Sequence, residues 1–105
     1  MKKIIKPLVV ASLLLAPFVL LGTASAGDVA AGQAKSANCA GCHGMNGKSN
    51  NPSNPNLAGQ KEAYLEKAIK AYRDGQRKDP MMNSMVAGLS DSDIADLAAF
   101  FASVK

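Results

Sequence analysis

The sequence NCAGCHGMNG, residues 38–47, contains both cysteines and the only histidine of this 105-residue chain. Cys39 and Cys42 are separated by two residues, and His43 follows directly. Two thiols and one imidazole at such short spacing are typical of a disulfide, of a zinc site or of a covalently attached haem. These three sites predict different proteins, and the rest of the chain helps to choose between them.

The first 26 residues have the pattern of a secretory signal peptide. Three lysines among the first six residues are followed by an apolar run over residues 8–21 and by small residues at 24–26. The run is shorter than the ~20 residues that a membrane-spanning helix needs. We therefore expect cleavage after Ala26, no stable membrane anchor, and a single domain over residues 27–105 in the periplasm.

The expected mature domain carries little net charge. Without the three lysines of the signal peptide, 9 Lys and Arg remain against 8 Asp and Glu, a net charge of +1. No basic run or stripe indicates nucleic-acid binding. A domain of about 80 residues buries little core and usually needs additional support, and this one has few aromatic residues with which to fill its centre.

Apolar residues recur at helical spacing, and we predict an all-α chain with three main helices. In residues 91–103, with Ser90 as N-cap, one buried stripe is expected from Ile94, Leu97, Ala98 and Phe101. In residues 61–73, ending before Gly75, the apolar face is expected from Leu65, Ala68, Ile69 and Tyr72.

The first predicted helix runs from Asp28, a plausible N-cap, to about Cys39. Val29, Gly32 and Ala37 are small residues at which another helix could approach closely. Two long loops, residues 44–60 and 75–89, are expected between the three helices. Because loops of this length are uncommon in compact domains unless they are functional or disordered, we interpret them as the walls of a bound group.

A disulfide or a zinc ion explains the cysteines poorly. A Cys39–Cys42 disulfide would join no distant parts of the chain, and redox-active pairs of this spacing belong to folds with strands, of which the sequence gives no sign. Structural zinc sites need four ligands. Cys39, Cys42 and His43 supply three, adjacent Cys and His side chains rarely reach one ion, and no second cluster exists in the sequence.

Covalent haem explains the motif and its surroundings together. Cys-x-x-Cys-His in an exported chain is the attachment signature of haem c. Two thiols one helical turn apart suit the two vinyl groups at one edge of the porphyrin, and His43 can then offer its neutral imidazole to the iron. The haem would also supply the apolar core that the side chains lack. One attachment motif predicts one haem c per chain.

The second axial ligand of the iron cannot be another histidine. A methionine thioether is the natural soft donor, and a His/Met pair raises the reduction potential of haem iron. Met45 is tied to the His43 side by its position in the chain. Met81, Met82 and Met85 lie in the predicted loop before the last helix, which could cross the opposite face of the haem.

The chain resembles a small class I cytochrome c and is similar to a single-haem half of the cytochrome c-four type. The stretches that carry this resemblance cover nearly all of residues 27–105: GDVAAGQAKSANCAGCHGMNG, NPNLAGQ, YLEKAIKAYRDGQR and DPMMNSMVAGLSDSDIADLAAFFAS. The resemblance implies the cytochrome c fold, in which the first and last helices cross and two loops wrap one covalently bound haem.

The resemblance also implies roles for individual residues. Cys39 and Cys42 would form the haem thioethers, and His43 would be the proximal iron ligand. The family's distal methionine matches Met82. The carbonyl of Pro55 would accept a hydrogen bond from His43, and Arg77 would lie near a haem propionate.

The function implied is a periplasmic monohaem electron carrier, and not an enzyme. It would be a monomer that docks briefly with redox proteins, namely a quinol-oxidising complex and a terminal oxidase or reductase. Ala40, Gly41, Met45 and Met81 are candidates for the docking surface by position. The alternative is a haem-based sensor or catalytic haem protein with an open distal site, for which Asn83 and Ser84 are the nearby polar residues.

Overall fold

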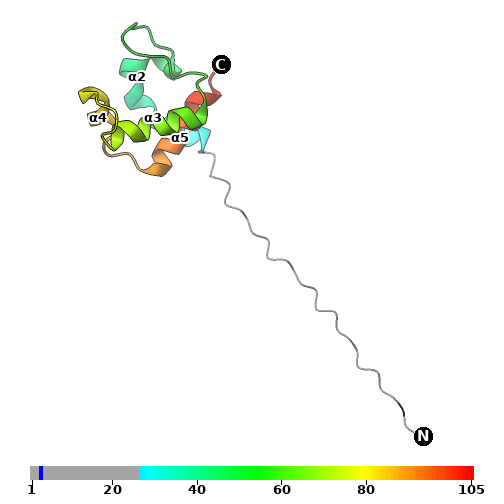
Figure 1. The fold of residues 1–105 in the computed structure, drawn as a ribbon. Coiled ribbons are helices and arrows are strands. Elements are labelled where there is room, and N and C mark those ends of the chain that lie inside the picture. The colour runs from blue at the N-terminus through cyan, green and yellow to red at the C-terminus, as the bar shows by residue number, and fades with distance from the viewer. Residues whose placement is uncertain (1–2, 4–26) are drawn as a thin grey trace.

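The computed structural model describes Lys3 and residues 27–105, and the described part of the chain is helical, without strands (Figure 1). The signal peptide predicted for residues 1–26 lies outside the described residues, apart from Lys3. The helices are α1 (Val29–Lys35), α2 (Ala37–His43), the 3₁₀ turn η1 (Met45–Gly47), α3 (Glu62–Arg73), α4 (Pro80–Val86) and α5 (Asp91–Ser103). No helix within these described residues has the length and hydrophobicity needed to cross a membrane. The all-α prediction is confirmed.

Helix α5 has the predicted bounds and forms the centre of the core. Its first turn is a capping box, because Ser90 Oγ accepts from the Asp93 N–H while the Asp93 carboxylate accepts from the Ser90 N–H, both at 3.0 Å. All four residues of the predicted stripe are buried, and Ile94 is fully inaccessible. Ala99 and Phe100 are buried as well. Neighbours therefore cover α5 on a wider face than the stripe predicted.

Helix α3 also follows the prediction closely. Leu65 and Ile69 are buried and pack in the core against α5. Lys70 and Glu66, one turn apart, form an ion pair of 2.9 Å on the outer side. Gly75 lies just beyond the end of the helix with a φ of 80°, a conformation that favours glycine.

The single helix predicted from Asp28 to Cys39 is wrong, because two helices occupy this region. Helix α1 ends at Lys35, and α2 begins at Ala37 and continues through the attachment motif to His43. At the break, the Ser36 hydroxyl donates to the carbonyl of Gln33 at 2.6 Å. Serine side chains that bond nearby carbonyls compete with the helical ladder. The break gives the attachment motif a helix with its own direction.

Helices α1 and α5 cross at a very close contact centred on Gly32. A Cβ atom at Gly32 would lie 1.9 Å from the carbonyl oxygen of Asp96 and 2.8 Å from the Cβ of Phe100. The crossing of the first and last helices is therefore present, and Gly32 is the residue that permits it. Val29 and Ala37, which the sequence also suggested, are exposed and do not form this contact.

A buried carboxylate fastens α1 to α5 beside this crossing. Asp96 accepts the backbone N–H of Asp28 at 2.8 Å and the ammonium of Lys35 at 2.6 Å. Lys35 also pairs with Asp93 at 2.9 Å. The hydrogen bond from Lys35, followed by bonds from Ser90, lowers the pKa of Asp93 to about 2. Lys35, followed by the Asp28 N–H, also lowers the pKa of Asp96.

The predicted loop over residues 75–89 is wrong in part, because it contains α4. Asp79 is the N-cap of this helix and accepts from the N–H groups of Met81 and Met82 at 3.0 and 3.1 Å. Pro80 follows at the first helical position, where its missing N–H costs nothing. The Asp-Pro pair was the sequence signal for this helix. In the other long loop only η1 is regular structure.

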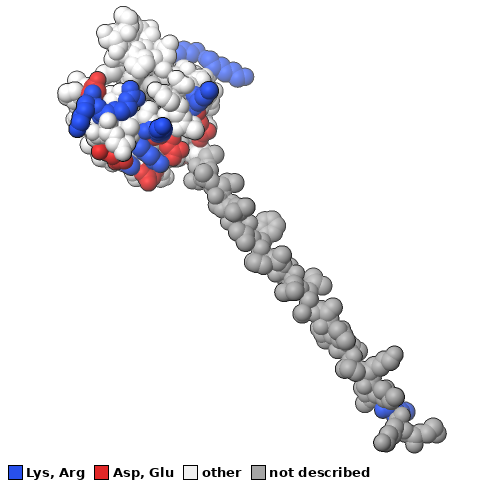
Figure 2. Space-filling model, viewed as in Figure 1, with Lys and Arg blue, Asp and Glu red and all other residues white. Residues whose placement is uncertain are grey.

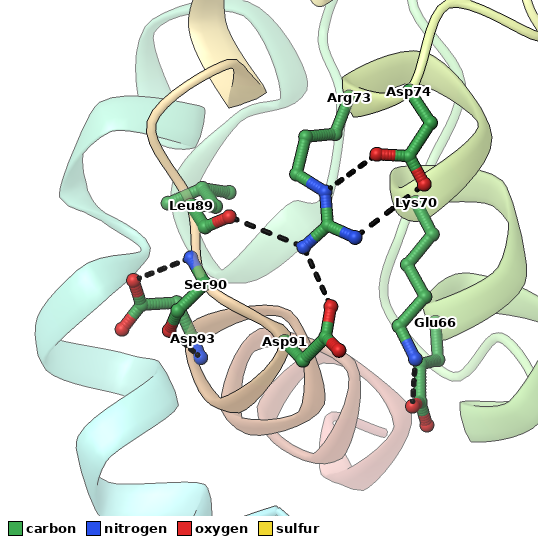
Figure 3. Close-up of polar contacts among 8 residues, drawn as sticks. All are labelled: Glu66, Lys70, Arg73, Asp74, Leu89, Ser90, Asp91 and Asp93. Carbon is green, nitrogen blue, oxygen red and sulfur yellow. Dashed lines mark hydrogen bonds and ion pairs between the residues drawn. The ribbon is translucent and has the colours of Figure 1, made fainter.

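One arginine holds together the two ends of the segment that contains α4 (Figure 3). Arg73, the last residue of α3, donates to the Asp74 carboxylate at 2.9 Å. Its Nη1 donates to the Leu89 carbonyl at 3.2 Å and to the Asp91 carboxylate at 2.7 Å. The segment therefore leaves α3 and reaches α5 at the same guanidinium.

We predict that Gly32→Ala destabilises the protein by about 2 kcal/mol or more, because its methyl group overlaps the backbone of α5. Within a helix this substitution alone would stabilise by about 1 kcal/mol, so a loss isolates the contact. Urea unfolding of the haem-loaded protein measures the change. Gly88→Ala is the control, because nothing lies within 4 Å of its Cβ position. A Gly32→Ala variant as stable as the parent would contradict the close crossing.

We also predict a defined pH dependence for the α1–α5 fastening. Because the pKa values of Asp93 and Asp96 lie below their ordinary value of 3.8, their contribution is complete above that pH and is lost as the pH falls toward about 2. The stability difference between the parent and Lys35→Met should therefore shrink over this interval in urea titrations. Lys48→Met, at an exposed position, should show no such change. A difference that stays constant down to pH 2 would contradict the assignment.

Candidate haem site

Helix α2 presents the two cysteines one turn apart. Cys39 is partly buried and packs against the core, whereas Cys42 is exposed. No disulfide joins them. Burial, and secondarily the neighbouring Cys42, raises the pKa of Cys39, so that this thiol is neutral at pH 7 and packs as a small apolar group. Conversion of such a thiol to a thioether removes a polar S–H and introduces no charge.

The imidazole of His43 is buried and held by a backbone carbonyl. The side chain is 7% exposed, and its Nδ1 lies 2.9 Å from the carbonyl oxygen of Pro55. The carbonyl can only accept, so Nδ1 carries the proton and the lone pair lies on Nε2. Among the described residues, the hydrogen bond of this ring is that of Nδ1 with Pro55. The His43–Pro55 contact that the resemblance implied is present, and it leaves one nitrogen available to a metal.

The loop that supplies this carbonyl is fastened to α2 at a neighbouring point. The carboxamide of Asn54 donates to the carbonyl of Cys42 at 2.9 Å, next to the His43–Pro55 contact. That second bond satisfies a carbonyl in the last turn of α2 that the helix leaves free. Sequence reasoning missed Asn54, because an asparagine in a loop rich in Asn and Pro gives no distinguishing signal.

The donor atoms suit haem better than a bare metal ion. Within residues 27–105 and Lys3, no three His, Cys, Asp or Glu side chains converge into a group that could hold a metal ion. A zinc site would require such convergence. Haem c does not, because the thiols bond to carbon atoms of the porphyrin and only the imidazole bonds to iron. Two separate thiols and one oriented imidazole on the same short helix fit that group.

The described methionines differ sharply in exposure. Met45, Met81 and Met85 are 76%, 64% and 45% exposed, respectively. Met82 is partly buried and packs against the same core cluster as Cys39. A thioether that is to bond iron beside the core must leave the solvent, so the packing distinguishes Met82 from its neighbours.

Arg77 lies on the surface, where its guanidinium carbon is 4.4 Å from the centre of the Tyr72 ring. This is a cation–π contact. The role at a haem propionate that the resemblance implied for Arg77 stays a prediction.

Comparison with known proteins agrees with this site. The model of the cytochrome c family matches residues 29–105. Cytochrome c-554(548) from Halomonas halodenitrificans is 54% identical over 81 residues, which are 74% of this chain and 98% of that protein. Cytochrome c4 from Pseudomonas aeruginosa is 50% identical over 81 residues, 77% of this chain and 40% of that protein.

The fold has a similar solved counterpart. The crystal structure of reduced recombinant cytochrome c4 from Pseudomonas stutzeri superposes with a TM-score of 0.73 at 44% identity, and covers 76% of this chain and 47% of that one. This chain therefore spans nearly all of the Halomonas protein and less than half of each c4 protein. The Cys39–Cys42–His43 motif fits covalently attached haem c, the cofactor of this family. The chain belongs to the cytochrome c family.

Proposed function

We propose that this chain is a periplasmic monohaem electron carrier whose iron is ligated by His43 and Met82, with Cys39 and Cys42 as the thioether attachments. Haem c, when bound, supplies an iron that gains and loses one electron. The observation that carries the proposal is the buried imidazole of His43, held by Pro55 with Nε2 left as donor. An imidazole oriented in this way directly after two thiols is suited to bind the iron of haem c.

The hydrogen bond from His43 to Pro55 has two consequences for electron transfer. It selects the tautomer whose Nε2 can bind iron, and it makes the ring a stronger donor. It also restrains the ring, because Pro55 belongs to a loop that Asn54 fastens to α2. A restrained ligand changes its position little when the charge on the iron changes, which keeps the reorganisation small.

Met82 is proposed as the distal ligand on three observations. It alone among the described methionines is partly buried, and it packs against the cluster that Cys39 also contacts. Asp79 holds its backbone N–H at 3.1 Å. A thioether opposite histidine favours the ferrous state and raises the reduction potential.

The surface over α2, the loop that follows it and α4 supports brief docking with little electrostatic steering. Residues 36–60 contain Lys48 as their only Lys, Arg, Asp or Glu, and residues 80–90 contain none. The surface over α2 and the loop that follows it is correspondingly almost free of charged side chains in the view of Figure 2. Met45 and Met81 are exposed, as the docking hypothesis requires. The proposed partners remain a quinol-oxidising complex and a terminal oxidase or reductase.

No observation favours the alternative of a sensor or a catalytic haem protein. An open distal site would need a free hydrogen-bonding group, and Asn83 and Ser84 were the candidates. The Asn83 carboxamide is engaged by three backbone groups. Ser84 is exposed.

We predict a low-spin haem c spectrum with the red charge-transfer band of Met–Fe(III) coordination, unchanged by carbon monoxide after reduction. Met82→Ala should abolish the band, admit carbon monoxide and lower the reduction potential, because the iron loses its soft ligand. Met85→Ala is the matched control and should retain the band, since Met85 is 45% exposed. If Met85→Ala alone opens the iron, the assignment to Met82 is wrong; a parent spectrum that shifts with carbon monoxide would favour the sensor.

We predict that both thiols attach the haem. The double variant Cys39→Ser, Cys42→Ser should release its haem on acid–acetone extraction, because only the iron–ligand bonds would remain to hold it. The parent protein and Ser36→Ala, a change just before α2 that touches neither thiol, should retain the haem. Haem that stays with the double variant after extraction would exclude thioether attachment at these positions.

A further inference from the structure

The carboxamide of Asn83, the residue after Met82, makes three hydrogen bonds to backbone groups. Its nitrogen donates to the carbonyl of Tyr72 at 2.7 Å and to the carbonyl of Arg77 at 2.8 Å. Its oxygen accepts from the N–H of Asp79 at 2.9 Å. A side-chain amide can make about four such bonds, so the capacity of this one is nearly filled by three separate points of the chain.

These contacts connect the first turn of α4 to the end of α3. Tyr72 lies in the last turn of α3, and Arg77 lies in the turn that follows it. Among the described residues, Asn83 makes the side-chain hydrogen bonds that join α4 to another part of the fold. Asp79 and Asn83 also bond reciprocally, because the Asn83 N–H donates to the backbone carbonyl of Asp79 at 2.8 Å while the Asn83 carboxamide oxygen accepts from the Asp79 N–H.

Apolar packing holds the other end of α4 differently. Val86, 5% exposed, anchors the last turn in the core, and it lies one turn after Met82 on the same face. Apolar contact is not directional, so the packing of Val86 and Met82 on the core does not by itself fix the rotation of the helix. The hydrogen bonds of Asn83 are directional and fix the rotation of α4 about its axis. That rotation decides where the Met82 thioether points.

We propose that Asn83 is a positioning residue for the distal ligand: its carboxamide locks the first turn of α4 to the end of α3 and so keeps the Met82 thioether on the iron. The inference rests on the proposed ligation by Met82. Without the hydrogen bonds of Asn83, α4 would pack on the core in more than one orientation. The thioether would then compete less well against external ligands.

Binding of imidazole to the ferric haem protein tests the inference, because imidazole must displace the methionine. Loss of the amide contacts in Asn83→Ala should raise the apparent affinity for imidazole by about tenfold and weaken the Met–Fe(III) band. Asn83→Asp keeps the size and the acceptor but loses the donor to Tyr72 and Arg77, so its apparent affinity for imidazole should also rise. This second variant keeps the test possible if Asn83→Ala loads poorly with haem. Lys35→Met is the control, because it breaks an α1–α5 contact only.

The outcomes distinguish a failure of the positioning role of Asn83 from a failure of the His/Met ligation on which it rests. A parent protein without the Met–Fe(III) band, together with an unchanged Met82→Ala variant, would refute His/Met ligation and the role of Asn83 with it. A parent with the band, and Asn83 variants that lose stability in urea yet bind imidazole as the parent does, would overturn the inference alone. Tighter imidazole binding in both Asn83 variants, with none in Lys35→Met of similarly reduced stability, is the result expected.

Discussion

The contact of Gly32 with the backbone of Asp96 is the constraint on which the rest of the structure depends. It brings α1 and α5 closer than side chains would allow, and the Asp96 carboxylate then reaches both Asp28 and Lys35. Because only Ser36 separates the end of α1 from the start of α2, this crossing also places the attachment motif relative to the core helix α5. A larger residue at position 32 would therefore displace α2, and His43 with it.

The loop after the motif is held against the same helix by backbone contacts. The carbonyl of Gly47 accepts from Leu57 and Ala58, at 2.8 and 3.1 Å, and the carbonyl of Phe101 accepts from Gly59 at 2.9 Å. Gly47 has a φ of 76°, and a Cβ atom there would lie 2.7 Å from the Phe101 ring. Both the positive φ and the lack of space for a Cβ atom therefore require glycine at position 47. The result is a loop without regular structure that nevertheless presents the Pro55 carbonyl at a defined place.

The two sides of the proposed haem site are therefore held by different kinds of contact. On the histidine side, the carbonyl that meets His43 belongs to a loop that main-chain hydrogen bonds tie to Gly47 and, through Gly59, to Phe101 of α5. On the methionine side, the short helix α4 is held by the apolar packing of Val86 and Met82 and by the hydrogen bonds of one polar side chain, Asn83. In the second arrangement the side-chain hydrogen bonds come from a single carboxamide, the group that we propose positions Met82.

Local patterns determined much of this protein from the sequence alone. The Cys-x-x-Cys-His motif identified the cofactor, and the stripes of α3 and α5, with Ser90 and Gly75 at their ends, gave the helices of the core. Each of these depends on residues a few positions apart. The resemblance added Pro55 and Met82. The Asp79-Pro80 start of α4 was also readable, and the sequence analysis missed it.

The tertiary structure alone decided what depends on distant residues. Three features follow from how the helices meet: the break at Ser36, the hydrogen bond of Asn83 to Tyr72, and the partial burial of Met82 beside the exposed Met81 and Met85. From the sequence alone, the Asn83 carboxamide could face solvent equally well. Which backbone carbonyls it finds, and which methionine turns inward, are set by the packing of α4 on α3 and α5, and no spacing along the chain encodes them.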